Sequence, residues 1–480
     1  MPVPVPAPAA PAPALAAAGE GNKMTILNVD RFKSKLDNLK SKITHLQPPI
    51  STSEPGLFHY TRDDGLERSR IHLRVEEDGS GLLLVNANRI MHLNLTAAFM
   101  ARLALEDTPV PHAVRALTHC YHISTTQARV DYAQFTETLA ELIRPDGACP
   151  LHDLNLEVTA PFSARPSAPY RMDLALTYRC NDDCAHCYNG RPRNYPEIST
   201  DQWKRILDRL WELGIPHVVF TGGEPTLRPD LPELVAHAEQ NGQITGLNTN
   251  ARRLSDARFV ERLVQAGLDH VQITVESHDS AIHDQMVRTN GAWQQTIAGL
   301  QNVLDTPLYV MTNTTMLREN SPHLERTLEF FSDLGVPTVG LNALIYSGRG
   351  RSVGTGLKEE ELSPLLDLAR QHTTEHGQRL IWYTPTQYCH FDPMQLELGV
   401  KGCTAALFNM CVEPDGGVIP CQSYYHQLGN LLTDPWQSIW NHELSTSLRE
   451  RSSIPVKCNG CALLAECGGG CPLQSQIASD

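Results

Sequence analysis

A chain of 480 residues is long enough for two to four domains, each with a core of its own. Hydrophobic residues make up 41% and charged residues 20% of the chain, and no apolar run approaches the ~20 residues that cross a bilayer, so a membrane protein is not expected. The net charge of −14 repels phosphate backbones, which argues against nucleic acid as a partner.

The N-terminal third divides into four segments by composition. Residues 1–23 are rich in proline and alanine and are expected to be a disordered extension, since they lack the basic start and helical apolar stretch of a secretory signal. A linker with a helical segment is expected at 24–67. Residues 68–145 combine alternating strands at 69–75, 82–85 and 89–93 with helical apolar spacing at 95–105, 111–121 and 132–143. This pattern predicts a small α+β module, followed by a proline-rich linker at 146–170.

From residue 171 to 385 the pattern alternates between strand and helix. Strands are expected at 172–178, 217–220, 244–247, 270–275, 308–315 and 338–345. Repeated βα units imply a parallel sheet, and six of them can curl into a partial (β/α)6 TIM barrel. Active sites in such folds lie at the carboxyl ends of the strands. The two most unusual loops of the chain follow the first and second strands directly, which indicates a catalytic site there.

Cysteine usage indicates metal ligation. Most of the 13 cysteines lie in the loop at 180–187 or beyond residue 388, in a segment (386–480) that is rich in cysteine and glycine and poor in apolar residues. Clustered cysteines in a long chain without an export signal are typical of metal or Fe–S sites in a reducing cytoplasm, rather than of disulfides. We therefore expect a cytoplasmic protein with a C-terminal Fe–S cluster domain.

The loop after the first strand carries Cys180, Cys184 and Cys187 in a CX3CX2C spacing. Three thiolates in one short loop can hold three corners of a [4Fe-4S] cubane and leave the fourth iron without a protein ligand. The alternative to such a cluster is a zinc site that lacks its fourth ligand. The loop after the second strand reads Thr221-Gly222-Gly223-Glu224-Pro225, which alone is a weak signal.

Together, these two loops resemble the radical S-adenosylmethionine (SAM) superfamily, and the likeness covers about residues 170–376. It implies that the open iron binds SAM, which is reductively cleaved to a 5′-deoxyadenosyl radical that takes a hydrogen atom from the substrate. An electron donor such as flavodoxin or ferredoxin is then expected. In this reading Glu224 balances the ammonium of SAM, Arg288 pairs with its carboxylate, and Thr274 and Glu276 stand for the family's usual serine and aspartate. The implied SAM-binding residues are His186, Tyr188, Gly222, Gly223, Glu224, Pro225, Asn248, Asn250, Thr274, Glu276 and Arg288.

The C-terminal cysteines resemble the SPASM domain, which carries one or two auxiliary [4Fe-4S] clusters. Cys458-X2-Cys461-X5-Cys467-X3-Cys471 follows Cys403 and Cys421. The resemblance implies a barrel-proximal cluster on Cys403, Cys421 and Cys471, and a distal one on Cys458, Cys461 and Cys467.

Two further cysteines remain without a fixed role. The family usually has a further cysteine beyond this run, and residues 472–480 contain none. Cys389 or Cys411 could supply the missing ligand, or the distal cluster has an open or non-cysteine site, or it is absent. Cys389 and Cys411 also compete to complete the proximal cluster. Cys411 could instead be a buried strand thiol, and Cys389 a catalytic thiol that donates a hydrogen atom.

The module at 68–145 resembles the peptide-recognition element of ribosomal-peptide maturases, known as a stand-alone chaperone in pyrroloquinoline-quinone biosynthesis. A winged-helix domain has a similar pattern. The resemblance implies that a leader peptide adds as a strand to the edge at 89–93 and packs on the last helix. The expected function is a radical SAM maturase that modifies a precursor peptide by crosslink, thioether, epimerisation or excision. The alternatives are a radical SAM enzyme of cofactor or haem biosynthesis that acts on a small molecule, and a non-enzymatic Fe–S or zinc scaffold.

Overall fold

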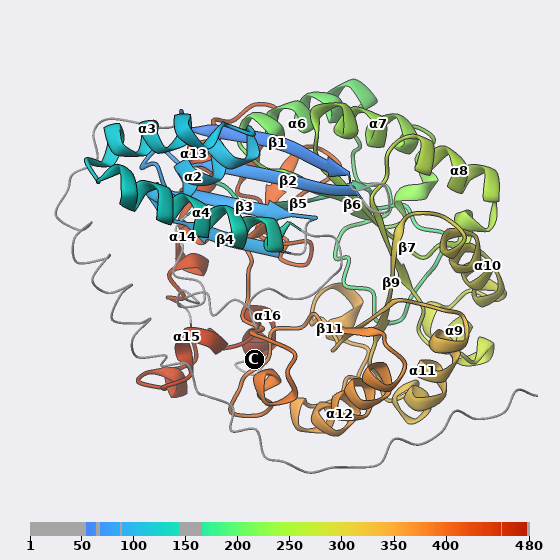
Figure 1. The fold of residues 1–480 in the computed structure, drawn as a ribbon. Coiled ribbons are helices and arrows are strands. Elements are labelled where there is room, and N and C mark those ends of the chain that lie inside the picture. The colour runs from blue at the N-terminus through green and yellow to red at the C-terminus, as the bar shows by residue number, and fades with distance from the viewer. Residues whose placement is uncertain (1–53, 64–67, 87–88, 144–165, 453, 478–480) are drawn as a thin grey trace, which may run out of the picture.

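The computed structural model describes residues 54–477, except 64–67, 87–88, 144–165 and 453. The expected extension at 1–23, most of the expected helical linker at 24–67 and most of the linker at 146–170 lie outside the described residues. Two sheets organise the rest: a four-stranded antiparallel sheet and a ten-stranded mixed sheet (Figure 1).

The N-terminal module consists of the antiparallel sheet and three helices. Its strands pair in sequence order: β1 (Gly56–Asp63), β2 (Arg68–Val75), β3 (Gly81–Val85) and β4 (Arg89–Leu93). The helices are α2 (Leu95–Leu105), α3 (Val110–Tyr121) and α4 (Thr125–Leu142). β1 was not expected, because we assigned its residues to the linker at 24–67. The last helix begins seven residues before the expected 132, where Ser124 accepts a hydrogen bond from the backbone N–H of Gln127 and caps it.

Strand alternation in β2 explains how the module is attached to the rest of the chain. Ile71, Leu73 and Val75 face the module's own core with residues of α2 and α4. The intervening side chains Arg70, His72 and Arg74 are also buried, although they are polar. Side chains alternate between the two faces of a strand, so these three point away from the module's helices.

The three polar side chains contact the barrel just before its strands begin. Arg70 binds Asp269 with bonds of 2.8 and 3.0 Å, and His72 Nε2 donates to the carbonyl of Gly242 at 2.7 Å. Arg74 donates to the carbonyl of Gly214 at 3.2 Å. Gly214, Gly242 and Asp269 all precede barrel strands, so the module packs on the amino-terminal face of the barrel (Figure 1).

The ten-stranded sheet has the order β11-β10-β9-β8-β7-β6-β5-β12-β13-β14. β5 to β11 are mutually parallel and form the expected partial barrel, with one strand more than the six predicted. The extra strand is β11, a four-residue segment too short to show a clear period. The strands are β5 (Arg171–Thr177), β6 (His217–Gly222), β7 (Ile244–Thr249), β8 (His270–Thr274), β9 (Tyr309–Thr315), β10 (Thr338–Asn342) and β11 (Arg379–Trp382).

Helices cover the outside of the barrel sheet. They are α6 (Thr200–Glu212), α7 (Leu231–Asn241), α8 (Ala257–Gln265), α9 (Ser280–Val287), α10 (Ala292–Leu304), α11 (Leu324–Asp333) and α12 (Glu359–Glu375). In α6, Ser199 and Gln202 form a capping box, and the apolar stripe that begins at Trp203 is fully buried against the sheet. One continuous core therefore lies between sheet and helices.

The C-terminal region extends the barrel sheet instead of forming a detached unit. β12 (Asn409–Val412) pairs in parallel with β5, and β13 (Gly417–Ile419) and β14 (Gly429–Asn430) follow antiparallel. Four short helices complete it: α13 (Trp436–Trp440), α14 (Glu443–Arg449), α15 (Leu464–Cys467) and α16 (Pro472–Ile477). The ladder between β5 and β12 ties the first barrel strand to the cysteine-rich region.

Candidate functional site

The cysteine loop at 180–187 leaves the carboxyl end of β5 and is pinned to the end of α9. The backbone N–H groups of Asp183 and Ala185 donate to the carbonyls of Val287 and Met286 at 3.0 and 2.9 Å. Within the loop, the N–H of Asp182 donates to Cys180 Sγ at 3.4 Å, a contact that favours the thiolate. The loop is thus held from outside as well as by its own turns.

The three thiols of this loop lie within electrostatic reach of one another. Burial raises the pKa of Cys180 to about 12, and the negative charges of Glu224, Asp182 and Cys187 add to the effect. Burial also raises the pKa of Cys184 well above its usual value, with further contributions from Cys187 and Cys180. Such a set is costly as bare thiolates and is stabilised when metal takes the place of the protons.

The thiols of Cys180, Cys184 and Cys187 fit a [4Fe-4S] cluster, because a cubane with one open iron requires three thiolate ligands. Among the described residues, no group of three or more histidine, cysteine, aspartate or glutamate side chains is arranged to hold one metal ion.

The two glycines after β6 are required by the chain itself. A Cβ on Gly222, whose φ is +135°, would lie 2.2 Å from the carbonyl oxygen of Thr177, and one on Gly223 would lie 2.3 Å from that of Arg179. The N–H of Gly223 donates to Thr177 at 2.7 Å. The two glycines thus let the end of β6 pack on the start of the cysteine loop, and their expected role in SAM binding stays a prediction.

Glu224 is buried and accepts four hydrogen bonds from its own chain. Its Oε1 accepts from the backbone and hydroxyl of Thr226 at 3.0 and 2.6 Å and from the hydroxyl of Thr249 at 2.7 Å, while Oε2 accepts from the N–H of Asn250 at 2.8 Å. Burial nevertheless raises its pKa. Pro225 follows in the same loop and begins a short 3-10 turn, Pro225–Leu227. Glu224 thus joins the loops after β6 and β7.

Asn250 carries this network into the cysteine loop. Its side-chain amide donates to Asn181 at 2.8 Å and to Asp182 at 2.9 Å. Arg252, which the sequence reasoning did not select, binds Asp182 at 2.7 Å from the same turn. Asn248 lies half-buried near the end of β7. Asn250 therefore positions the loop.

The residues predicted at the end of β8 and after α9 divide into two groups. Glu276 is fully buried: His186 Nε2 donates to its Oε1 at 2.9 Å, and the N–H of Thr315 donates to its Oε2 at 2.9 Å. The other ring nitrogen of His186 is buried without a hydrogen-bond partner. Thr274 is half-buried, and Arg288 is exposed at the left-handed end of α9. The structure thus brings His186 and Glu276 together and leaves Arg288 at the surface.

Two further arginines that the sequence reasoning missed hold the cysteine loop. Arg193 donates to the carbonyls of Cys180 and Asp182. Arg349 donates to Asp183 at 2.7 Å, and its backbone N–H donates to the carbonyl of Cys187 at 2.9 Å. The hydrogen bond from Arg349 is the main reason that the pKa of Asp183 is lowered. The sequence signal for these two arginines was that they lie in loops rich in glycine and arginine, and this signal is weak.

The cysteine loop is also joined to the C-terminal region. Tyr188 donates from its hydroxyl to Gln422 at 2.9 Å. Arg191 donates two hydrogen bonds, of 2.7 and 2.9 Å, to the fully buried carboxylate of Glu413. The hydroxyl of Tyr178 donates to the same carboxylate at 3.1 Å. Such a bidentate pair is geometrically specific.

The C-terminal thiols form two groups. Burial raises the pKa of Cys421 to about 12 and that of Cys403 further, and Cys471 acts on both. The second group unites Cys458 with Cys467, Cys461 and Cys389. Cys411 lies apart from the second group, although Cys421 of the first group is among its electrostatic neighbours. It lies buried in β12, packed with Ala175, Tyr178 and Ile419, and Asp173 is its first electrostatic neighbour.

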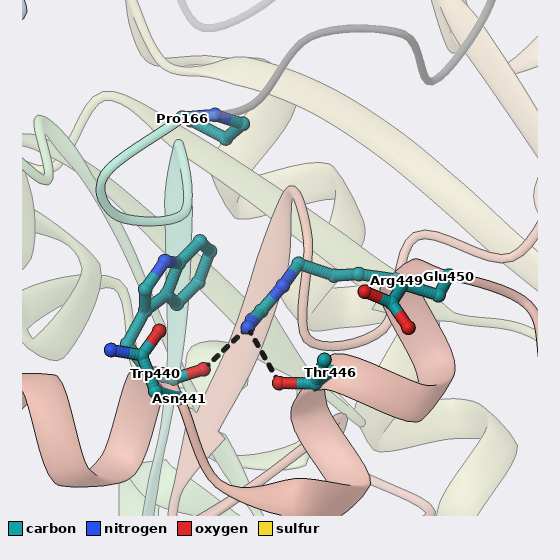
Figure 2. Close-up of a pocket in the computed structure, with 6 residues that line it drawn as sticks. All are labelled: Pro166, Trp440, Asn441, Thr446, Arg449 and Glu450. Atoms are coloured by element: carbon teal, nitrogen blue, oxygen red, sulfur yellow. Dashed lines mark hydrogen bonds between the residues drawn. The ribbon is translucent and has the colours of Figure 1, made fainter.

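A cavity of about 280 Å³ opens elsewhere, beside α13 and α14 (Figure 2). Arg449 crosses it, with its guanidinium 4.2 Å from the ring centre of Trp440 and a bond of 2.6 Å to the carbonyl of that residue. None of the predicted site residues lines it.

No helix in the described part of the chain is both long and apolar enough to span a membrane.

Comparisons with known proteins agree with this geometry. Residues 174–331 match the radical SAM superfamily, and residues 403–462 match the SPASM iron–sulfur cluster-binding domain. The chain is similar to PqqA peptide cyclase of Rhodopseudomonas palustris (31% identity over 64% of this chain and 83% of the relative). It is also similar to AdoMet-dependent heme synthase of Methanosarcina barkeri (26% identity over 64% of this chain and 92% of the relative).

Among solved structures, SuiB of Streptococcus suis bound to precursor peptide SuiA has the same fold (TM-score 0.62, 17% identity, 87% of this chain and 96% of that chain). The family assignment removes the non-enzymatic scaffold that we considered. The chain therefore belongs to the radical SAM superfamily: it is an enzyme that binds a [4Fe-4S] cluster and SAM, with auxiliary Fe–S clusters in a C-terminal SPASM domain.

Proposed function

We propose that this enzyme modifies a ribosomally made precursor peptide, whose leader binds the N-terminal module. The outer edge of β4 carries this proposal. Among the described residues β4 pairs only with β3, so no described strand lies along this edge, and a peptide can add there as a further strand. Ile90 on this edge is 40% exposed, which is unusual for an isoleucine in a strand and suits contact with an apolar side chain.

The site residues divide into ligands and positioning residues. We propose that Cys180, Cys184 and Cys187 hold the catalytic cluster. Bound SAM supplies the radical that abstracts hydrogen, and the chain's own residues orient it and exclude water. Glu224 retains one unused lone-pair position on Oε2 for the ammonium of SAM. His186, held by Glu276, presents its free ring nitrogen to the cofactor side of the loop.

Other residues complete the proposed cofactor pocket. Tyr188 lies next to the cluster loop and is fixed by Gln422. Asn248 and Thr274 stand at the ends of strands that border the barrel mouth. Arg288 is exposed and lies near Asp183, and its proposed role is to balance the charge of the SAM carboxylate. Cys403, Cys421 and Cys471 are proposed to hold the proximal auxiliary cluster, and Cys458, Cys461 and Cys467 the distal one.

The placement of the module constrains the peptide. The leader edge lies on the amino-terminal side of the barrel, whereas the cysteine loop lies at the carboxyl ends of its strands. A strand of seven residues such as β5 spans about 20 Å at ~3.3 Å per residue. An extended peptide therefore needs at least about six residues between leader contact and modified residue. Tethering by the leader raises the effective concentration of that residue at the site.

The test is hydrogen transfer from peptide to SAM. Reconstituted enzyme, SAM and a low-potential reductant are incubated without oxygen with a deuterated precursor peptide encoded beside the gene, or with a porphyrin substrate of haem synthesis. Deuterium in 5′-deoxyadenosine from the peptide is the expected result. Turnover of the porphyrin alone would overturn the proposal and favour the alternative that the haem synthase relative suggests.

A matched pair of variants tests the leader edge. Ile90→Asp places a charge on the outer edge of β4, and Val110→Asp makes the same kind of change on α3, at a residue that is 49% exposed. We expect KM for the peptide to rise at least tenfold in Ile90→Asp and to be unchanged in Val110→Asp. Cleavage of SAM without peptide should be equal in both. Equal peptide KM values for both variants would refute binding at this edge.

A further inference from the structure

The segment around Cys389 packs directly on the cysteine run at 458–471. The backbone N–H of Tyr388 donates to Cys467 Sγ at 3.4 Å, and that thiol in turn contacts the carbonyl of Thr386 at 3.6 Å. Gln387 donates from its side-chain amide to the carbonyl of Gly469 at 3.3 Å. The residues just before Cys389 are thus held by two contacts with Cys467 and one with Gly469.

The residue after Cys389 is held from the other side of the same group. His390 Nδ1 donates to the carboxylate of Glu359 at 3.0 Å, which leaves Nε2 as an acceptor for the ammonium of Lys457 at 3.3 Å. Lys457 immediately precedes Cys458. The backbone at 388–390 is therefore fixed at both ends, with Cys467 on one side and the start of the CX2C pair on the other.

Four thiols come together across this contact, since Cys467, Cys389 and Cys461 all lie within electrostatic reach of Cys458. Cys458 and Cys467 are buried, whereas Cys389 and Cys461 are exposed. Two buried and two exposed thiols suit a cluster seated at the surface of the domain.

We propose that Cys389 is the fourth thiolate ligand of the distal auxiliary cluster, together with Cys458, Cys461 and Cys467. This inference rests on the distal site proposed above and adds a ligand from a segment that lies about 70 residues upstream of the other three. Four thiolates close a [4Fe-4S] cluster and leave no open iron. The N–H of Tyr388 at Cys467 is the kind of hydrogen bond to a ligand sulfur that tunes a cluster potential.

This assignment decides between the two roles that the sequence left open for Cys389. A thiolate bound to iron has no S–H to give, so the same residue does not serve as a hydrogen donor in the loaded enzyme. Cys411, the other candidate ligand, is buried in β12 among Ala175, Tyr178 and Ile419 and contacts the carbonyl of Val412 at 3.6 Å. Its place next to β5 puts it outside the group around Cys458.

The experiment measures iron, sulfide and electron paramagnetic resonance in the full-length enzyme after anaerobic reconstitution. Three variants are compared with wild type: Cys389→Ala, Cys458→Ala and Cys120→Ala, the last a thiol in the N-terminal module. Cys458→Ala is expected to lose the iron and sulfide of one cluster. Cys389→Ala is expected to lose the same cluster, or to keep a three-iron form with its own signal in the oxidised protein. Cys120→Ala should match wild type.

Each remaining outcome has one meaning. Because Cys389 is exposed, its replacement by alanine leaves no cavity, and circular dichroism checks that the fold is kept. If Cys458→Ala loses a cluster while Cys389→Ala keeps full iron and an unchanged spectrum, the ligand role of Cys389 is refuted and the proposed distal site stands. If Cys458→Ala also keeps full iron, there is no distal cluster and both proposals fall.

Discussion

Acid should weaken the contact between the N-terminal module and the barrel, because His72 is buried there in its neutral form. Its Nε2 donates to the carbonyl of Gly242, and its ring stacks on His59 at 4.7 Å and meets Trp211 edge-on at 6.0 Å. Burial is the main cause that lowers the pKa of His72 to about 3, and the nearby charges of His59 and Arg70 lower it further. No acidic group contributes to holding a proton on this ring.

The size of the effect follows from the two pKa values. In the unfolded chain the pKa is about 6.5, so between pH 6.5 and 3 the unfolded state binds the proton and the folded state does not. The contribution of neutral His72 to stability is thus fully present above pH 6.5 and is lost as pH falls toward 3. Between pH 7.5 and 5.5 the loss is about 1.4 kcal/mol, at 1.36 kcal/mol per pKa unit.

The assay is urea unfolding at pH 7.5 and 5.5, followed by tryptophan fluorescence, to which Trp211 beside His72 contributes. The variant His72→Gln keeps an N–H donor but has no group that titrates, so its stability should fall by about 1.4 kcal/mol less than that of wild type over this range. His112→Gln changes an exposed histidine of α3 and should retain the wild-type pH dependence. Equal losses in His72→Gln and wild type would refute the argument.

Two further predictions concern the cysteine loop. In Gly223→Ala the new Cβ would lie 2.3 and 2.7 Å from the backbone oxygens of Arg179 and Tyr178. We therefore expect the variant to lose most of the iron of the cluster on Cys180, Cys184 and Cys187 after reconstitution. Gly354→Ala is the control: nothing lies within 4 Å of its new Cβ, and it should keep that iron. Arg349→Gln removes a positive charge beside the loop and should lower the reduction potential of that cluster by about 20–40 mV, as expected for an interaction of about 0.5–1 kcal/mol; an unchanged potential in a redox titration would show that the charge is screened.

Local patterns in the sequence were sufficient to predict the barrel and to place the cysteine loop after its first strand. The strand that ends at Thr177 and the stripe of α6 that begins at Trp203 each show their period within a dozen residues. The cysteine spacing is equally local, since all three thiols belong to one loop. Two strands escaped prediction. β11 has only four residues, and the eight-residue β1 was assigned to a linker although Phe58 and Tyr60 alternate along it and pack on the module's core.

The ion pairs and hydrogen bonds that could not be predicted join residues that are distant along the chain. Arg70 and Asp269 are 199 positions apart, and Arg349 and Asp183 are 166 apart. A buried arginine looks like a surface residue until its carboxylate is known. The same reason explains why the structural contacts of Glu224 were not predicted: its hydrogen bonds to Thr249 and Asn250 come from the next strand. Residues such as these organise the site, and only the fold identifies them.

The contacts of the cysteine loop suggest which parts of this enzyme move together. Just beyond the loop, Arg191 binds the fully buried Glu413 of the SPASM domain, and β5, from which the loop leaves, is paired with β12 of that domain. Removal of Arg191 would leave this carboxylate buried without its charge partner, which is costly, so this junction resists separation. The module, by contrast, rests on the opposite face of the barrel through contacts such as that of His72. If the module holds a precursor peptide, as proposed above, that peptide has to carry its target residue to a fixed site, and its length rather than a movement between the cluster domains would select the modified residue.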